Sequence, residues 1–96
     1  MKARWLSSAL RELDRHYEYI RQENPRAARR VFTQIRSAAC NLGRFPESGR
    51  VGQIDSTREV TVSGLPYLVV YRLTGGAVEI LRVVHTSMNW EADTKQ

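Results

Sequence analysis

Apolar residues recur at helical spacing in two neighbouring stretches of the chain. The first stretch carries them at Leu6, Ala9, Leu10, Leu13, Tyr17 and Ile20, and the second at Ala28, Val31, Phe32, Ile35, Ala38, Ala39 and Leu42. We expect Ser7 or Ser8 to cap the first helix. Its outer face should carry Arg11, Glu12, Arg15, Glu18 and Arg21, with His16 solvated among these charged residues.

The second predicted helix has clear start and stop signals. Asn24 is a good cap, and Pro25 suits the first helical position. Gly43 is placed to end the helix, and Cys40 lies near its apolar side, so we expect a core thiol. Because the connection between the two helices is short, they should form an antiparallel hairpin.

The start of the chain and its second half have the pattern of β-strands. Strands are expected at residues 2–5, 57–62, 67–73 and 77–84, with Gly75-Gly76 as a tight hairpin turn and residues 44–56 as a loop. The order β-α-α-β-β-β predicts an α+β fold in which the helical hairpin packs on one face of a small, largely antiparallel sheet. Residues 1–96 should form one domain, with a frayed tail from about residue 91.

Positive charge is concentrated in the first half of the chain. The net charge is +5, and Arg supplies 13 of the 15 basic residues. Residues 1–50 hold 11 basic and five acidic side chains, whereas residues 51–96 hold four and five. Such a balance fits nucleic acid, the ribosome or an acidic protein as partner. The candidate target-binding residues are Arg26, Arg29, Arg30 and Arg36, together with Trp90.

Other classes of protein are disfavoured by composition. One Cys and two His, far apart in sequence, lack the spacing of a metal site, so we expect neither a metal nor a cofactor. A single Cys allows no internal disulfide, which fits a reducing compartment. No apolar run is long enough to cross a bilayer, and no signal peptide is evident. These features predict a cytoplasmic protein without a membrane partner.

An ordered set of short motifs across about the first 90 residues resembles the RelE/ParE superfamily of toxins from type II toxin–antitoxin, or plasmid stabilisation, systems. These motifs are Trp5 with Ala9 and Leu13, Tyr19-Ile20, Asn24-Pro25 with Ala27-Ala28, Leu42 with Phe45-Pro46, Gly49-Arg50, Thr57-Arg58-Glu59-Val60, Pro66-Tyr67-Leu68-Val69-Val70-Tyr71, and Val83-Val84-His85 closing with Trp90. The set carries the resemblance, because no single motif is specific.

The resemblance implies a growth-inhibiting cytoplasmic toxin that a cognate antitoxin neutralises. The antitoxin of this family wraps a flexible segment around the toxin and binds promoter DNA, which the toxin reaches only indirectly. RelE-type members cut mRNA on the ribosome, whereas ParE-type members poison DNA gyrase. A homodimer and a toxin–antitoxin hetero-oligomer both stay open, as does an inactive relative that acts only in an antitoxin complex.

The two branches differ in the chemistry they require. A metal-free ribonuclease needs a base, an acid and cations for the phosphate, and the candidates here are Arg58, Tyr71, Arg72, Arg82 and His85. Compared with the nuclease branch, Leu68 replaces a phosphate-binding Arg, and no Arg follows His85 near Met88. These departures favour the ParE branch and a protein that is not an enzyme.

Strand parity suggests where the antitoxin binds. Residues two apart in a strand share a face, which groups Leu68 with Val70 and Arg72, and Ile80 with Arg82 and Val84. If both sets face away from the helices, they form an apolar surface with two Arg. We expect this surface to hold an antitoxin segment.

Overall fold

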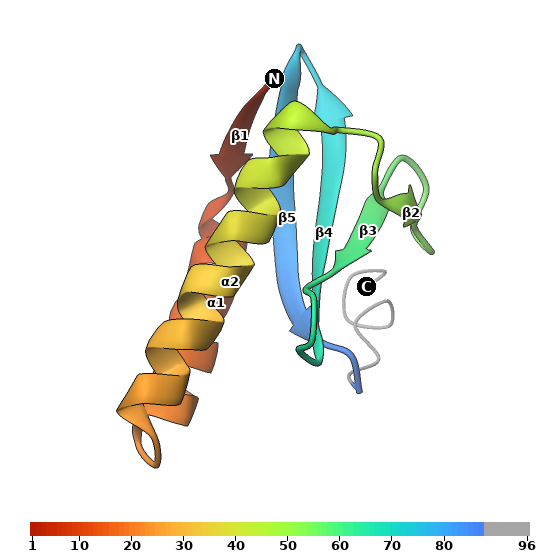
Figure 1. Ribbon diagram of the computed structural model, residues 1–96. Coiled ribbons are helices and arrows are strands. Elements are labelled where there is room, and N and C mark those ends of the chain that lie inside the picture. Colours follow the sequence, from red (N-terminus) through yellow and green to blue (C-terminus); the bar gives the residue numbers. More distant parts are fainter. Residues whose placement is uncertain (88–96) are drawn as a thin grey trace.

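The computed structural model describes residues 1–87 (Figure 1). Its elements are β1 (Lys2–Trp5), α1 (Ser7–Arg21), α2 (Pro25–Arg44), β2 (Arg50–Val51), β3 (Arg58–Thr61), β4 (Tyr67–Thr74) and β5 (Ala77–His85). The expectations for Trp90 and for a frayed tail from about residue 91 lie outside the described residues.

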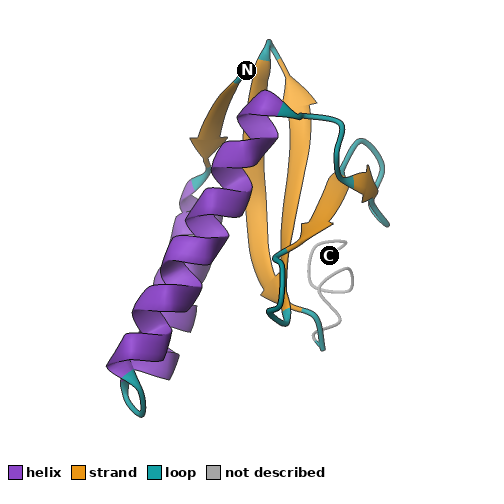
Figure 2. Ribbon diagram, in the orientation of Figure 1, coloured by secondary structure: helices purple, strands orange, loops and turns teal. Residues whose placement is uncertain are grey.

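The strands form one five-stranded sheet in the order β1-β5-β4-β3-β2, and both helices cover the same face (Figure 2). Strand β1 runs parallel to β5, and the other neighbours are antiparallel. The predicted α+β fold is therefore confirmed. The loop expected over residues 44–56 is wrong at Arg50–Val51, which pairs with β3 as the edge strand β2.

The main core lies between the helices and the sheet. The apolar stripes of both helices meet the helix-facing side chains of β4 and β5 there. Its fully buried members include Ala9, Ile35, Ala39, Val69, Tyr71, Val78, Ile80 and Val83. Cys40 follows Ala39 directly, and the turn of the helix carries its thiol to the exposed side. The expectation of a core thiol at Cys40 is wrong.

The two helices begin differently. Asn24 caps α2 as predicted, because its Oδ1 accepts a hydrogen bond from the Ala27 N–H at 3.0 Å. The N-cap of α1 is Leu6, whose side chain makes no cap hydrogen bond. The capping role expected of Ser7 or Ser8 is therefore wrong, and the Ser8 hydroxyl instead donates to the Leu81 carbonyl at 2.9 Å.

Gly43 does not end α2, which continues to Arg44 with Phe45 as its C-cap. The amino group of Met1 donates to the Gly43 carbonyl at 2.7 Å. A Cβ at position 43 would lie 2.5 Å from the Met1 carbonyl oxygen, so this glycine permits a close approach of two backbones. The predicted hairpin turn at Gly75-Gly76 is confirmed, with φ of 56° and 76°. No helix within residues 1–87 has the length and apolar character to span a membrane.

Candidate functional site

The face of the sheet turned away from the helices carries a second, smaller apolar cluster. Leu68, Val70 and Val84 are buried there, with Ile54 and Leu81 packed against them. Leu68 pairs with Val84 across the β4–β5 ladder, and Val70 pairs with Arg82. The expectation that these positions share the far face is confirmed.

Ile80 is the exception in the predicted set. A β-bulge between Val70 and Tyr71 shifts the register so that Ile80 pairs with Tyr71 and Leu81 is the extra residue. Ile80 is fully buried in the core under the helices. The expectation that Ile80 shares a face with Arg82 and Val84 is therefore wrong, because the bulge reverses the alternation between them.

Beside this cluster lies a hollow of about 320 Å³. Its walls come from β4, β5, the start of α1 and the loop before β3, and they include Ser8, Ile54, Val70, Arg72, Leu81 and Arg82. Three of the residues expected to bind the antitoxin, Val70, Arg72 and Arg82, thus line one depression. We call this depression the far-face hollow.

Arg82 is held by a carboxylate on α1. Its Nε and Nη2 donate to Glu12 Oε2 at 2.9 and 2.7 Å. The other oxygen, Glu12 Oε1, accepts from the Val83 backbone N–H at 2.9 Å. Glu12 is only 7% exposed, so its expected place on the outer face of the helix is wrong. The sequence pattern missed it because a carboxylate is rarely buried without a partner, and its partner lies 70 residues away.

Arg72, which also lines the hollow, is likewise engaged by a carboxylate. Its Nε donates to Glu79 Oε1 at 2.7 Å, and Arg4 Nη2 donates to Glu79 Oε2 at 2.6 Å. The hydrogen bonds from Arg72 and then Arg4 lower the pKa of the Glu79 carboxyl from its usual value. This carboxylate therefore joins strands β1, β4 and β5.

Tyr71 and Arg58 hold the loop that precedes β2. The Tyr71 hydroxyl donates to the Pro46 carbonyl at 2.8 Å and accepts from the Gly49 N–H at 2.9 Å. Arg58 Nη1 donates to the Gly49 carbonyl at 2.9 Å. The ring of Tyr71 is fully buried, and its hydroxyl connects β4 to the backbone of this loop.

His85 lies at the other end of β5 in an aromatic cluster. The Tyr67 ring makes edge contacts with His85 and with His16 of α1, at centroid separations of 5.4 and 4.9 Å. His16 Nε2 lies 2.9 Å from the Val83 carbonyl oxygen, so the expectation of a solvated His16 is wrong. Burial raises the pKa of the Tyr67 hydroxyl. His85 Nδ1 lies 2.8 Å from the Ser87 hydroxyl.

The five residues considered for a ribonuclease site do not converge. His85 pairs with Tyr67 at one end of the β4–β5 ladder, whereas Arg72 pairs with Glu79 toward the other. At about 3.4 Å per residue, five residues along β4 separate these positions by roughly 17 Å. Arg58 and Tyr71 point to the loop before β2, and Arg82 points to α1.

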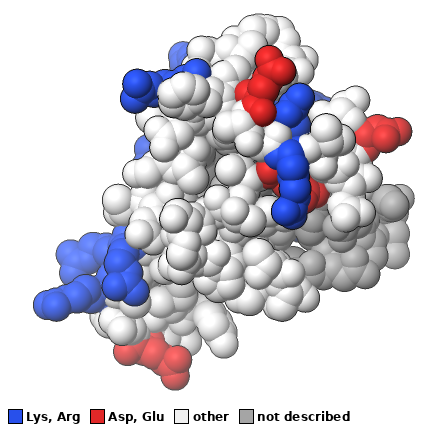
Figure 3. Space-filling view, turned by 45° about the vertical axis from the view of Figure 1, so that its right-hand side comes forward, with Lys and Arg blue, Asp and Glu red and all other residues white. Residues whose placement is uncertain are grey.

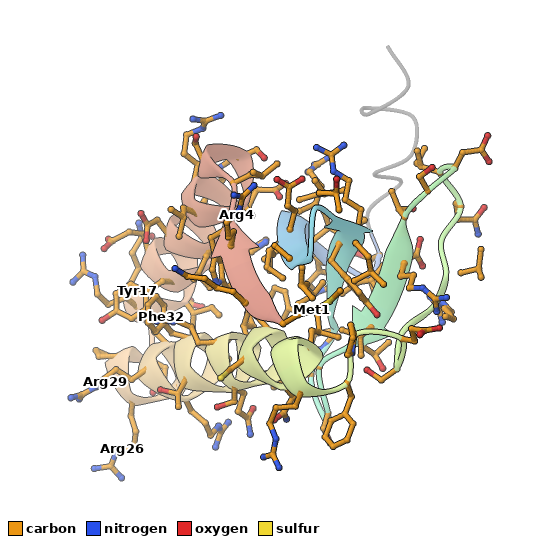
Figure 4. The ribbon with its side chains drawn as sticks, turned by 90° about the horizontal axis from the view of Figure 1, so that it is seen from above. Met1, Arg4, Tyr17, Arg26, Arg29 and Phe32 are labelled. Carbon is orange, nitrogen blue, oxygen red and sulfur yellow. The ribbon has the colours of Figure 1, made fainter. Side chains whose placement is uncertain are left out.

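The predicted target-binding arginines lie together on α2. Arg26, Arg29, Arg30 and Arg36 are all exposed. Arg26 and Arg29 project away from the body of the molecule, whereas Phe32 turns toward Tyr17 of α1 (Figure 4). Trp90, expected to complete this surface, lies outside the described residues.

A larger groove of about 480 Å³ runs between α2 and β3. The residues that line it include Gln34, Ala38, Leu42, Phe45, Val60 and Val62. None of the predicted site residues within residues 1–87 lines this groove, because its walls come from two elements that the sequence does not show to be adjacent. Within residues 1–87, no group of three or more His, Cys, Asp or Glu side chains is arranged to hold a metal.

This arrangement of a helical hairpin on a mixed five-stranded sheet is found in toxins of toxin–antitoxin systems. A solved structure described as the chromosomal ParDE system from P. aeruginosa superposes with a TM-score of 0.81, over 88% of this chain and 95% of that one, at 23% identity. That likeness establishes the fold. A model of the family "ParE toxin of type II toxin-antitoxin system, parDE" matches residues 3–90. The chain belongs to this family, which confirms the RelE/ParE resemblance.

Named relatives agree with this assignment. The chain is 43% identical over 89 residues to "Putative toxin Y4kP" of Sinorhizobium fredii, covering 93% of this chain and 92% of the relative. It is 35% identical over 83 residues to toxin RelE2 of Caulobacter vibrioides, covering 86% and 92%. Toxin RelE1 of the same organism is 32% identical over 80 residues, covering 80% and 84%. The protein is thus a type II toxin, and its family implies an antitoxin partner.

Proposed function

We propose that this toxin inhibits growth by poisoning DNA gyrase and not by cutting RNA. The proposal starts from the ParE family match over residues 3–90. The resemblance implies that members of the ParE branch act on gyrase without nuclease chemistry. The observation that carries the choice of branch is the disposition of the five candidate catalytic residues.

Four of these residues already have a structural task, namely Arg58, Tyr71, Arg72 and Arg82. Arg72 and Arg82 neutralise the carboxylates of Glu79 and Glu12, and the Tyr71 hydroxyl joins two backbone groups. A nuclease gains its rate from donors and bases that are preorganised around one reacting phosphate. The cations are paired, and along the sheet Arg72 lies roughly 17 Å and Arg82 roughly 10 Å from His85, so they do not form such a site.

The gyrase assay tests the target directly. Purified gyrase, relaxed plasmid and ATP are incubated with increasing toxin, with and without an equimolar amount of the antitoxin. We expect loss of supercoiling together with accumulation of cleaved plasmid, both reversed by the antitoxin. A folded toxin that leaves supercoiling unchanged at a large molar excess over gyrase contradicts the proposal.

Replacement of His85 separates the two branches in cells. The His85→Ala variant should stay toxic when it is induced without antitoxin, because no step of gyrase poisoning needs an imidazole there. Growth after induction is the measurement, and the far-UV circular dichroism spectrum checks the fold. If the folded variant loses toxicity and the wild type cleaves ribosome-bound mRNA, the ribonuclease branch is correct.

We further propose that the antitoxin segment binds at the far-face hollow. The adjoining apolar cluster suits the apolar side of an amphipathic segment. Ile54→Glu places a charge in the wall and should weaken antitoxin binding at least tenfold in calorimetry. Val51→Glu is the matched control, since Val51 is 79% exposed and does not line the hollow. Equal affinities of the two variants would exclude this location.

A further inference from the structure

Helix α2 carries an unusual concentration of one charge. Its 20 residues, Pro25–Arg44, include five Arg and no Asp or Glu. The neighbouring α1, Ser7–Arg21, has three Arg and three acidic residues and is neutral overall. The five charges of α2 therefore equal the net charge of the whole chain, +5.

All five arginines lie on the helix face opposite the core. At 100° per residue, the arginines at positions 26, 29, 30, 36 and 44 fall within an arc of about 120°, and the buried residues Ala28, Val31, Ile35, Ala39 and Leu42 fall on the other side. From Arg26 to Arg44 this stripe is about 27 Å long. The exposed residues between the arginines are Thr33, Gln34, Ser37, Cys40 and Asn41. We call these ten residues the basic face.

The arginines of the basic face are available to a partner. Among residues 1–87, no carboxylate lies within ion-pair distance of any of the five, although six other arginines have such pairs. Arg36 and Arg44 lie over the rings of Phe32 and Phe45, at 5.8 and 5.6 Å from the ring centroids. Basic side chains gather over the lower part of the helical hairpin in Figure 3. An unpaired guanidinium retains all its donors for an external anion.

We propose that the basic face binds the phosphate backbone of duplex DNA directly. A row of cations about 27 Å long, interleaved with hydroxyl and amide side chains, matches the groups that proteins use on phosphates. An acidic protein surface is less suited, because the basic face offers no central apolar or aromatic anchor of the kind that dominates protein interfaces. Contacts to phosphates carry no sequence information, so this binding is distinct from promoter recognition by an antitoxin.

The choice of DNA over RNA rests on the proposed function, because gyrase presents duplex DNA to any molecule bound at its surface. Binding to DNA alone does not require gyrase, so the two proposals can fail separately. In the complex, phosphate contacts through α2 would hold the toxin against the DNA that gyrase cleaves.

Salt-dependent binding to a fluorescein-labelled 30-base-pair DNA duplex, followed by anisotropy, tests the inference. If each Arg neutralises one phosphate, log Kobs should fall with log[KCl] with a slope of about −4.5. The variant Arg26→Gln/Arg30→Gln should lower this magnitude to about 2.7. The control Arg11→Gln/Arg15→Gln removes the same charge at the same i, i+4 spacing from exposed positions of α1, and it should keep the wild-type slope.

The possible outcomes separate a DNA phosphate site on α2 from diffuse charge attraction, from RNA binding and from binding to an acidic protein. If the two double variants lose DNA affinity equally, the binding is diffuse attraction by net charge. If the wild type does not bind DNA at 50 mM KCl, the basic face is not a phosphate site. Either result overturns the inference. Tighter binding to an RNA duplex of the same length overturns the assignment to DNA. If DNA does not bind but the α2 variant alone loses gyrase inhibition, the partner is an acidic protein surface and the inference fails. DNA binding without any effect on gyrase would overturn only the proposed target.

Discussion

The two helices of the hairpin pack on the same face of the sheet, but they use their polar residues in opposite ways. In α1, Ser8, Glu12 and His16 follow one another at intervals of four residues, and all three contact the backbone of β5. In α2, the polar residues face outward, and the inward side is entirely apolar. Helix α1 is thus bound to the sheet by polar side-chain contacts as well as by apolar packing, whereas the buried side chains of α2 are all apolar.

The end of β1 explains this difference. Strand β1 pairs with β5 only from Ala77 to Ile80, so beyond Ile80 the outer edge of β5 has lost its neighbouring strand. Unpaired backbone groups at a buried edge are costly. The side chains of α1 satisfy them at Leu81 and Val83, whereas the buried side chains of α2 are all apolar.

The largest expected effect comes from removing the charge of Glu12. In Glu12→Gln, Arg82 loses the carboxylate that neutralises it, and breaking a buried ion pair on one side costs about 3 kcal/mol. The free energy of unfolding in urea measures the loss. The control is Glu18→Gln, which breaks an exposed pair with Arg21 and should change the unfolding midpoint little. Similar midpoints for the two variants would show that α1 needs no polar anchor.

This anchor is what the sequence could not show. Apolar periodicity correctly predicted both helices, because burial of a stripe dominates their stability. The same periodicity assigned Glu12 and His16 to the solvent side, since nothing in the neighbouring sequence shows that they lie against the open edge of β5. The carboxylate and the imidazole are inside because of where β1 ends, which is a property of the tertiary fold.

The candidate site on the far face of the sheet was also predicted only in part. Strand parity placed Leu68, Val70 and Val84 on one face, but one extra residue in β5 moved Ile80 to the other. A bulge has no clear signal in the run from Ala77 to Val84, because apolar residues lie on both faces of this strand. The prediction of a buried Cys40 failed for a different reason. One residue turns the helix by about 100°, which is enough to place Cys40 in solvent although Ala39 is buried.

A smaller effect is expected at His16. In His16→Leu the Val83 carbonyl loses its hydrogen-bond partner, and an unsatisfied buried acceptor costs about 1 to 2 kcal/mol. Hydrogen exchange of the β5 amides and the urea midpoint both report this loss. Arg15→Leu, at the exposed neighbouring position, should leave both unchanged. If the two variants behave alike, the imidazole makes no net contribution to holding α1 on the sheet.

Acid should act on the sheet and on α1 before it acts on α2, which has no carboxylate. The pKa of Glu79 is lowered in the folded state by Arg72 and Arg4. Its stabilising effect is therefore present above the unfolded-state pKa and is lost as the pH falls through the folded value. The urea midpoint of the wild type should fall below about pH 5, and Glu79→Gln should show a shallower fall. Parallel pH profiles would contradict this role of Glu79.

The smallest effect on stability should come from the basic face. Arg26→Gln/Arg30→Gln removes two like charges one turn apart near the positive end of α2, so the unfolding free energy should rise by up to about 0.5 kcal/mol. The urea midpoint measures this change. A slightly more stable toxin that binds DNA less tightly would show that the charges of α2 serve a partner and not the fold. A clear loss of stability would mean that these arginines, like the polar residues of α1, contribute to holding the helix in place.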